Sequence, residues 1–199
     1  MIEYVYETNI DDRVLARADR ILKDDGLIAY PTDSSWAIGG STNSKEAIEK
    51  LRRLKGGMKN YTISIICSDI SQMSELSNIA NPHFKLIKKL TPGPYVFILS
   101  ARNHIEKKIN MKRAEIGLRL PDRPIPRALV DVHGFPIYSV TACREMKNKE
   151  WWNYEFAEEH LFENGWEIED IEGVEMVIDT GEPQPKLLST VLRMTGNEV

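Results

Sequence analysis

Small hydroxyl and cationic side chains end or interrupt several apolar runs in this chain, and these residue types suit the binding of phosphate or carboxylate groups. Thr32 begins a Thr-Asp-Ser-Ser stretch directly after one apolar run, and Arg119 lies within another. Ser139 and Thr141 alternate with apolar residues in a third. Hydroxyl groups donate hydrogen bonds to oxyanions and guanidinium groups bind them in pairs, so a pocket that united these residues would bind an anion. Taken singly, each residue is explained as well by a turn, an ion pair or packing.

Two lysines in a neighbouring stretch add positive charge to this set. Lys55 ends a helical pattern, and Lys59 follows four residues later. A lysine ammonium is a compact charge that suits phosphate, although a lysine at a helix end is usually only solvated. Because all these residues are far apart in the sequence, their convergence is a hypothesis about the tertiary structure.

The sequence lacks the common catalytic and metal-binding signatures. It has no Walker A, GxGxxG, GxSxG or HExxH motif, which excludes P-loop, dinucleotide-binding, α/β-hydrolase and zinc-protease sites of the usual form. The four histidines do not cluster with Cys67 or Cys143 at ligand spacing, so we predict no metal site and two reduced core thiols in a cytoplasmic protein. The composition does not exclude a Ser-His-Asp catalytic arrangement, although no serine lies in a nucleophile elbow.

Length and composition predict one globular domain. The chain has 199 residues, of which 42% are apolar and 28% charged, and a chain of this size buries a sufficient core without a disulfide or a metal. It has no run of about 18 apolar residues, and its first residues lack the basic and apolar parts of a signal peptide. A membrane-spanning or secreted protein is therefore not expected.

Charge is distributed unevenly along the chain. Residues 1–143 contain 21 Lys and Arg against 16 Asp and Glu, whereas residues 144–199 contain 5 against 14. Residues 102–127 alone hold eight basic side chains against three acidic ones. This basic excess leaves open a non-catalytic module that binds double-stranded RNA, while an ordinary solvated surface explains it equally well.

Helical and strand-like patterns alternate along the chain. Apolar residues at helical spacing predict helices at 11–25, 44–55, 70–76, 81–90 and 126–130. Apolar or β-branched runs predict strands at 27–30, 61–67, 95–99, 115–120, 137–141, 174–179 and 189–193. Several runs are apolar throughout, as in strands that are covered on both faces. These patterns predict an α/β fold with a mixed or mainly parallel sheet, helices on both faces and ligand sites at strand ends.

Residues 145–175 have a different composition from the rest of the chain. They hold eleven acidic side chains and two lysines together with several aromatic residues, Trp151, Trp152, Tyr154, Phe156 and Trp166. We expect this segment to be an acidic aromatic insertion within a single domain of residues 1–199. A satellite helix packed on the body by its tryptophans is the favoured interpretation, and a binding cage or a lid is the alternative.

Residues 30–39 read YPTDSSWAIG, which closely resembles the opening YPTxxxxxxG signature of the YrdC-like family. The resemblance continues in order at 51–55 (LRRLK), 90–99 (LTPGPYVFIL), 116–121 (IGLRLP), 139–142 (SVTA), 177–181 (VIDTG) and 189–191 (STV). These motifs cover most of residues 25–193, so the chain is identified as a member of this family. The Thr-Asp-Ser sequence within the first motif is most similar to that of the YciO-like branch.

The resemblance implies a twisted mixed sheet in an open α/β fold of the kind found in DHBP synthase, with a positively charged concave face and a nucleotide pocket. Catalytic members join L-threonine, bicarbonate and ATP into threonylcarbamoyl-AMP and pyrophosphate, for the modification of tRNA adenosine 37. The resemblance further implies that the protein binds ATP or AMP, that Mg²⁺ accompanies ATP as substrate, and that no cofactor is tightly bound. It also implies that tRNA is a partner and that the protein is cytoplasmic and away from membranes.

Carried over by position, the resemblance gives a role to each hydroxyl and cationic residue. Thr32 would lie at the junction of threonine and nucleotide, Lys55 would face the phosphates, and Arg119 would face an anionic group. Ser139 and Thr141 would form hydrogen bonds with phosphate or substrate. We expect these five residues to line one concave site, with the 145–175 segment beside it or across its mouth.

The sequence departs from the family pattern in three places. The Lys-x-Arg pair reads Lys55-Gly56-Gly57, which loses a bidentate phosphate ligand that Lys59 would replace only in part. The Ser-x-Ser-Ala-Asn motif ends in Cys143, expected in the wall of the site, whose thiol is a weak donor. Synthases usually continue into a further strand with an arginine, a place that Arg193 does not fill. We therefore predict a nucleotide-binding relative of the synthases with reduced or altered activity.

Overall fold

A computed structural model describes residues 1–56, 63–103, 114–148 and 158–195, and Lys59 lies outside these ranges. The described strands are β1 (Ile2–Tyr4), β2 (Leu27–Pro31), β3 (Trp36–Ser41), β4 (Ser64–Ile66), β5 (Ser77–Asn78), β6 (Tyr95–Ala101), β7 (Glu115–Arg119), β8 (Ile137–Thr141), β9 (Val174–Asp179) and β10 (Thr190–Arg193). The described helices are α1 (Asp12–Lys23), α2 (Lys45–Lys55), α3 (Ile70–Leu76), α4 (Asn81–Leu90), α6 (Pro124–His133) and α7 (Arg144–Asn148), with short 3-10 turns η1 (Glu158–His160) and η2 (Gly165–Glu167).

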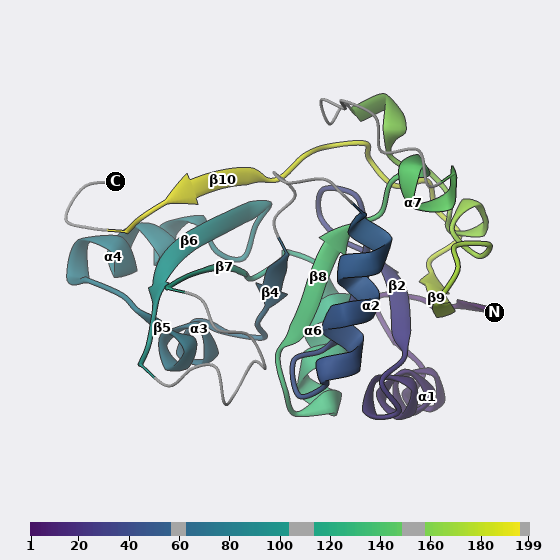
Figure 1. Ribbon diagram of the computed structural model, residues 1–199, viewed down its shortest axis with the longest axis horizontal. Helices are drawn as coiled ribbons and strands as arrows, with labels where there is room; N and C mark the ends of the chain where they lie inside the picture. The colour runs from purple at the N-terminus through teal and green to yellow at the C-terminus, as the bar shows by residue number, and fades with distance from the viewer. Residues whose placement is uncertain (57–62, 104–113, 149–157, 196–199) are drawn as a thin grey trace.

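The strands form one mixed sheet in the order β1-β9-β2-β3-β8-β4-β7-β6-β10, with β5 beside β6 (Figure 1). Parallel pairs join β1 to β9, β9 to β2, β4 to β7 and β6 to β10, and the other pairs are antiparallel. The order leaves β1 and β10 at opposite edges, so the sheet is open. This confirms the predicted fold class.

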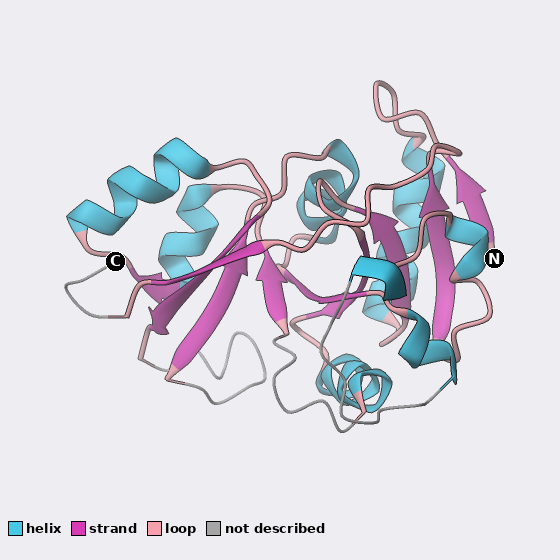
Figure 2. Ribbon diagram, turned by 90° about the horizontal axis from the view of Figure 1, so that it is seen from above, coloured by secondary structure: helices cyan, strands magenta, loops and turns pink. Residues whose placement is uncertain are grey.

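Helices cover both faces of the sheet (Figure 2). Apolar residues of α2, α3 and α4 pack in one core, and those of α1 and α6 pack in a second core. Strand β2 contributes side chains to both cores, because successive residues of a strand point to opposite faces. Leu27 and Ala29 face the first core, while Ile28 and Tyr30 face the second. A strand buried on both faces must be apolar at every position, which is the pattern that its sequence shows.

Three strands were missing from the sequence-based prediction, β1, β3 and the two-residue β5. The residues after Pro31 form only a short turn before β3 begins at Trp36. The two glycines of β3 made its sequence look unlike a strand, since glycine is depleted in strands. Packing explains Gly39, because a Cβ atom there would lie 2.6 Å from the Tyr30 hydroxyl.

The sheet is strongly curved between β2 and β7. Three strands separate them, so a flat sheet would hold them roughly 19 Å apart at the usual strand spacing. The Arg119 side chain on β7 nevertheless reaches Thr32 directly after β2, with 3.1 Å between Nη2 and Oγ1. Twist and curvature of the sheet therefore bring these strand ends together.

The 145–175 segment packs on the first core. Phe162, Ile168 and Ile171 are buried there, whereas the Trp166 side chain is largely exposed. Aliphatic and phenylalanine side chains, and not Trp166, therefore hold this part of the segment, while Trp151 and Trp152 lie outside the described residues. No helix in the described part of the chain is both long and apolar enough to cross a membrane.

Candidate functional site

The turn between β2 and β3 is held by the Thr32 side chain. Its hydroxyl oxygen accepts the amide protons of Ser34 and Ser35 at 3.2 and 3.3 Å and donates to the Ser35 carbonyl at 2.7 Å. A threonine hydroxyl that satisfies backbone groups in this way stabilises a tight turn. The local sequence therefore fixes the turn, and the turn presents residues 32–34 toward β7.

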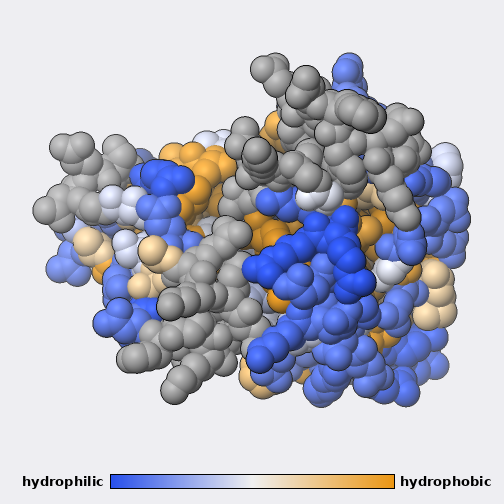
Figure 3. All heavy atoms as spheres, in the orientation of Figure 1, coloured by the Kyte–Doolittle hydropathy of each residue, from blue (hydrophilic) through white to orange (hydrophobic). Residues whose placement is uncertain are grey.

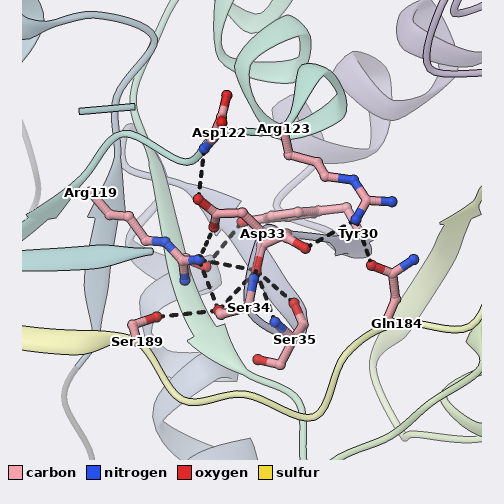
Figure 4. Close-up of polar contacts among 11 residues, drawn as sticks. Tyr30, Asp33, Ser34, Ser35, Arg119, Asp122, Arg123, Gln184 and Ser189 are labelled. Atoms are coloured by element: carbon pink, nitrogen blue, oxygen red, sulfur yellow. Dashed lines mark hydrogen bonds and ion pairs between the residues drawn. The ribbon is translucent and has the colours of Figure 1, made fainter. Parts of the chain in front are cut away.

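Arg119 crosses from β7 to this turn (Figure 4). Its Nη2 donates to Thr32 Oγ1 at 3.1 Å and to Ser34 Oγ at 2.9 Å, and it forms an ion pair with Asp33. The second Asp33 oxygen accepts the Asp122 amide proton at 2.7 Å. The chain thus supplies its own carboxylate to the buried guanidinium, whose side chain is 6% exposed.

A buried donor of Arg119 is unpaired. Its Nε is buried and has no hydrogen-bond partner among the described residues. Buried arginine donors are almost always paired, because an unpaired one loses its hydration without compensation. The geometry therefore leaves this buried Nε donor unpaired, beside the hydroxyls of Thr32 and Ser34.

The segment between β9 and β10, residues 180–189, covers the turn, and we call it the strap. It runs along the top of Figure 1 toward the edge of β6. The Leu187 amide donates to the Ser34 carbonyl at 3.1 Å, and the hydroxyls of Ser189 and Ser34 lie 3.3 Å apart. Gln184 accepts a hydrogen bond from Arg123 at 2.9 Å. Thr32 and Ser34 are consequently buried, and we name Thr32, Asp33, Ser34, Arg119 and Ser189 the turn cluster.

Ser139 on β8 contacts Tyr30, which precedes Thr32 by two residues. Its hydroxyl accepts a hydrogen bond from the Tyr30 hydroxyl at 3.1 Å. Burial raises the pKa of Tyr30 to about 12, although the Ser139 hydrogen bond and the nearby positive charge of Arg119 act in the opposite direction. Tyr30 therefore keeps its proton at neutral pH and holds the Ser139 hydroxyl in place.

The other predicted residues lie outside the contacts of Arg119. Lys55 is the half-buried last residue of α2, and Thr141, the last residue of β8, pairs with Ala37. Cys143 is buried, and burial together with the neighbouring Glu145 raises the pKa of its thiol to about 12. A thiol in this state is neutral and a poor nucleophile. The structure thus brings Thr32 and Arg119 into direct contact, whereas the Ser139 hydroxyl contacts Tyr30.

Three residues of the turn cluster were not identified from the sequence. Asp33 and Ser34 belong to the quoted motif, but nothing in the sequence shows that Asp33 pairs with an arginine 86 positions away. Ser189 opens the last motif, and its place over Ser34 depends on the path of the strap. For these three residues, the sequence offered one indication of a role in the site, namely that they are polar and lie after or beside apolar runs.

A Ser-His-Asp arrangement occurs elsewhere in the fold, and we call it the helix cluster. His133 ends α6, with its Nε2 at 2.7 Å from Ser41 Oγ and its Nδ1 at 2.9 Å from Asp19 Oδ1. Lys23 forms an ion pair with the other Asp19 oxygen at 2.6 Å. Ser41 is only 2% exposed, so a substrate has no access to its hydroxyl. These distances suit a triad, but the burial assigns the cluster a structural role.

The helix cluster also sets the ionisation of Asp19. Burial disfavours its charged form, but hydrogen bonds from Lys23 and His133 outweigh this and lower its pKa below the ordinary value. A carboxylate acceptor places the ring proton of neutral His133 on Nδ1, so that Ser41 donates to Nε2. Among the described residues, no three His, Cys, Asp or Glu side chains are arranged to hold a metal ion.

The chain thus has an open, curved α/β sheet, the class of fold in which ligands bind in the crevice outside the strand ends. The Sua5/YciO/YrdC family model, described as telomere recombination, matches residues 20–199. The chain belongs to this family.

Individual relatives agree with this assignment. YciO of Escherichia coli K12 is 34% identical over 139 residues, which cover 69% of this chain and 68% of that protein. A threonylcarbamoyl-AMP synthase of Bacillus subtilis is 25% identical over 143 residues, 71% of this chain and 41% of the synthase.

Solved structures show the same fold. The crystal structure of E. coli YciO has a TM-score of 0.82 at 29% identity and covers 99% of this chain and 91% of its own. P. abyssi Sua5 complexed with L-threonine has a TM-score of 0.77 at 22% identity and covers 98% of this chain and 54% of its own. The second likeness supports the fold alone.

Proposed function

We propose that this protein binds ATP and L-threonine and forms an adenylate related to threonylcarbamoyl-AMP, with reduced or altered activity. The observation that carries the proposal is the buried, unpaired Nε of Arg119 beside the hydroxyls of Thr32 and Ser34. Such a donor set suits a carboxylate or phosphate oxygen. The substrate class is suggested by relatives named threonylcarbamoyl-AMP synthase and by a Sua5 structure that contains L-threonine.

The proposed reaction has two bond-forming steps. The threonine nitrogen and bicarbonate first give a carbamate with loss of water. A carbamate oxygen then bonds to the α-phosphorus of ATP, and the bond to the β-phosphate oxygen breaks, which releases pyrophosphate. The contribution of this chain is to position the two substrates and offset negative charge through Lys55 and Arg119, while Mg²⁺ accompanies ATP.

Three features of the site support a reduced activity. An incoming anion must compete with Asp33 for the Arg119 guanidinium. The strap covers Ser34, so a ligand reaches the turn only after the strap moves. Gly57 and Cys143 replace an arginine and an amide of the family motifs, each of which would otherwise supply a strong hydrogen bond to substrate.

The test is pyrophosphate release from ATP in the presence of L-threonine and bicarbonate. We expect release to depend on both and to fall about ten-fold or more in Lys55→Ala, because one charge-assisted phosphate contact is lost. Lys45→Ala is the matched control, since Lys45 is an exposed lysine at the other end of α2. Equal rates for wild type and Lys55→Ala, or release without threonine, would overturn the proposal.

Binding of double-stranded RNA stays an untested prediction. In the basic stretch 102–127, the Arg119 side chain is buried and that of Arg123 is largely buried in its ion pair with Glu7, so neither is exposed for contact with an RNA backbone. The central part of the stretch lies outside the described residues. The described residues therefore give no specific support to this alternative.

A further inference from the structure

A pocket lies away from the turn cluster, on the face of the sheet that α2 covers. Its volume is about 490 Å³, within the usual range for small-molecule sites. Residues of α2, the start of β2, α7 and the loop before β9 line it, and no residue of the turn cluster does. Figure 3 shows hydrophobic surface beside the strongly hydrophilic surface of α2 in this region.

The floor of the pocket is apolar. Leu27 and Met146 are buried members of the first core that line it from below, and the half-buried Leu54 lines it from α2. These side chains come from three elements that pack on each other, so the floor is formed by the fold and does not depend on one loop. An aliphatic or aromatic group of a ligand would bury apolar surface against it.

One rim of the pocket is cationic. Lys50 and Arg53 lie three residues apart on α2, so both point to the same side of the helix. The Lys50 ammonium donates to the Asp25 carbonyl at 2.8 Å and forms no ion pair with any described residue. Arg53 pairs with Glu46 at 2.6 Å, but its side chain is 69% exposed. Lys50 therefore brings a positive charge without a neutralising carboxylate.

The charge of a suitable ligand is limited by the surroundings. Arg53 and Leu54 lie in the last turn of α2, where the helix dipole is negative and disfavours a polyanion. Glu172, which is exposed, lines the pocket from the loop before β9. A single negative charge next to an apolar body fits these conditions better than a polyphosphate.

We propose that this pocket binds a small monocarboxylate with an aliphatic or aromatic chain. The chain lies on Leu27, Leu54 and Met146, and the carboxylate accepts hydrogen bonds from Lys50 at the rim. Such a site is separate from the proposed adenylate chemistry. Its binding therefore requires neither ATP nor a movement of the strap.

The test is a titration of the folded full-length chain with octanoate, followed by calorimetry and by ligand-observed NMR, with octanol and octylamine as neutral and cationic probes. We expect saturable binding of octanoate and much weaker binding of the other two. Lys50→Met, which keeps the aliphatic stem, should weaken octanoate binding about five-fold or more, since it removes the charge partner. Lys45→Met is the matched control on the same helix and should leave binding unchanged.

A second variant tests the apolar floor. Leu54→Asp places a carboxylate in the pocket and should abolish octanoate binding, while a melting curve reports whether the chain still folds. Equal affinity for octanoate and octanol, an unchanged affinity in Lys50→Met, or the absence of saturable binding to wild type would each overturn the proposal. Pyrophosphate release by wild type is an independent measurement, so failure here and failure of the proposed function are distinguishable.

Discussion

The turn cluster and the helix cluster both join a serine hydroxyl to an ionisable pair, and both are buried. In the helix cluster, His133 uses both ring nitrogens, and Asp19 is shared between His133 and Lys23. In the turn cluster, Arg119 keeps an unpaired Nε and is covered by a strap whose described contacts to the turn are the Leu187 amide and the Ser189 hydroxyl. The residue types are similar, but only the turn cluster has an unused donor.

This difference separates a structural network from a binding site. A fully paired cluster gains nothing from a ligand, because every donor and acceptor already has its partner. A cluster with a buried unpaired donor is stabilised when an external oxygen fills it. Variants of the helix cluster should therefore change stability alone, and variants of the turn cluster should change stability and ligand binding together.

The largest effect is expected for Arg119→Met. It leaves the Asp33 carboxylate buried without its partner, which should lower the free energy of unfolding by about 3 to 5 kcal/mol, measured by urea denaturation. The double variant Asp33→Asn/Arg119→Met removes the unpaired charge and should recover most of this loss. A loss below about 1 kcal/mol in the single variant would contradict a buried pair of this kind.

His133→Ala should have the next largest effect. It leaves Ser41 without its acceptor, removes a hydrogen-bond partner of Asp19 and opens a cavity, so the free energy of unfolding should fall by about 2 to 3 kcal/mol. Pyrophosphate release per folded molecule should stay at the wild-type value. If His133→Ala lost pyrophosphate release but little stability, the helix cluster would have a catalytic role. The proposed distinction between the two clusters would then be wrong.

Asp33→Asn tests whether the chain's own carboxylate competes with a ligand. The amide still accepts the Asp122 proton but no longer neutralises Arg119, so pyrophosphate should bind about ten-fold more tightly, as measured by calorimetry. Asp170→Asn is the control, since Asp170 pairs with Lys147 at an exposed position of the 145–175 segment. Weaker binding in Asp33→Asn would show that Asp33 helps to hold the ligand.

Acid should weaken the helix cluster through Asp19. Its pKa in the folded protein is lowered, so its contribution to stability is complete above the ordinary value of 3.8 and is lost as the pH falls through the folded pKa. Asp19→Asn should lose stability at neutral pH and show a flatter profile in this acidic window. Unfolding curves at a series of pH values measure both, and parallel profiles for the two proteins would exclude this role of Asp19.

The smallest effect is expected for Ser189→Ala. Its hydroxyl contact with Ser34 is one neutral hydrogen bond at 3.3 Å, so the free energy of unfolding should change by about 0.5 to 1 kcal/mol at most. Hydrogen exchange of the Leu187 amide should become faster, because the strap has lost one of its contacts with the turn. Unchanged exchange at Leu187 would show that the strap is held by other contacts.

Much of the fold was predictable because local patterns and burial agree. The apolar runs of β2, β6, β8 and β9 and the helical spacing of α1 to α4 each matched an observed element. Ser44 caps α2 as its sequence indicates, with its side chain accepting the Ala47 amide proton at 2.9 Å. Strand β3 was not predicted because its glycines are atypical of strands. Gly39 is required by its close approach to Tyr30, which is a contact between two strands and leaves no signal in the local sequence pattern.

The sequence by itself determined the alternation of elements, the hydroxyl turn at Thr32 and the family of the chain, because these depend on residues that are neighbours along the backbone. Only the tertiary structure decided that Arg119 pairs with Asp33, that the strap covers Ser34, and that Lys50 lies at the rim of an apolar pocket without an ion pair to any described residue. Side-chain charge and hydroxyl chemistry are fixed by residue type. Whether such a group is neutralised or left unpaired depends on sheet curvature and on strand order, which bring together residues far apart in the chain.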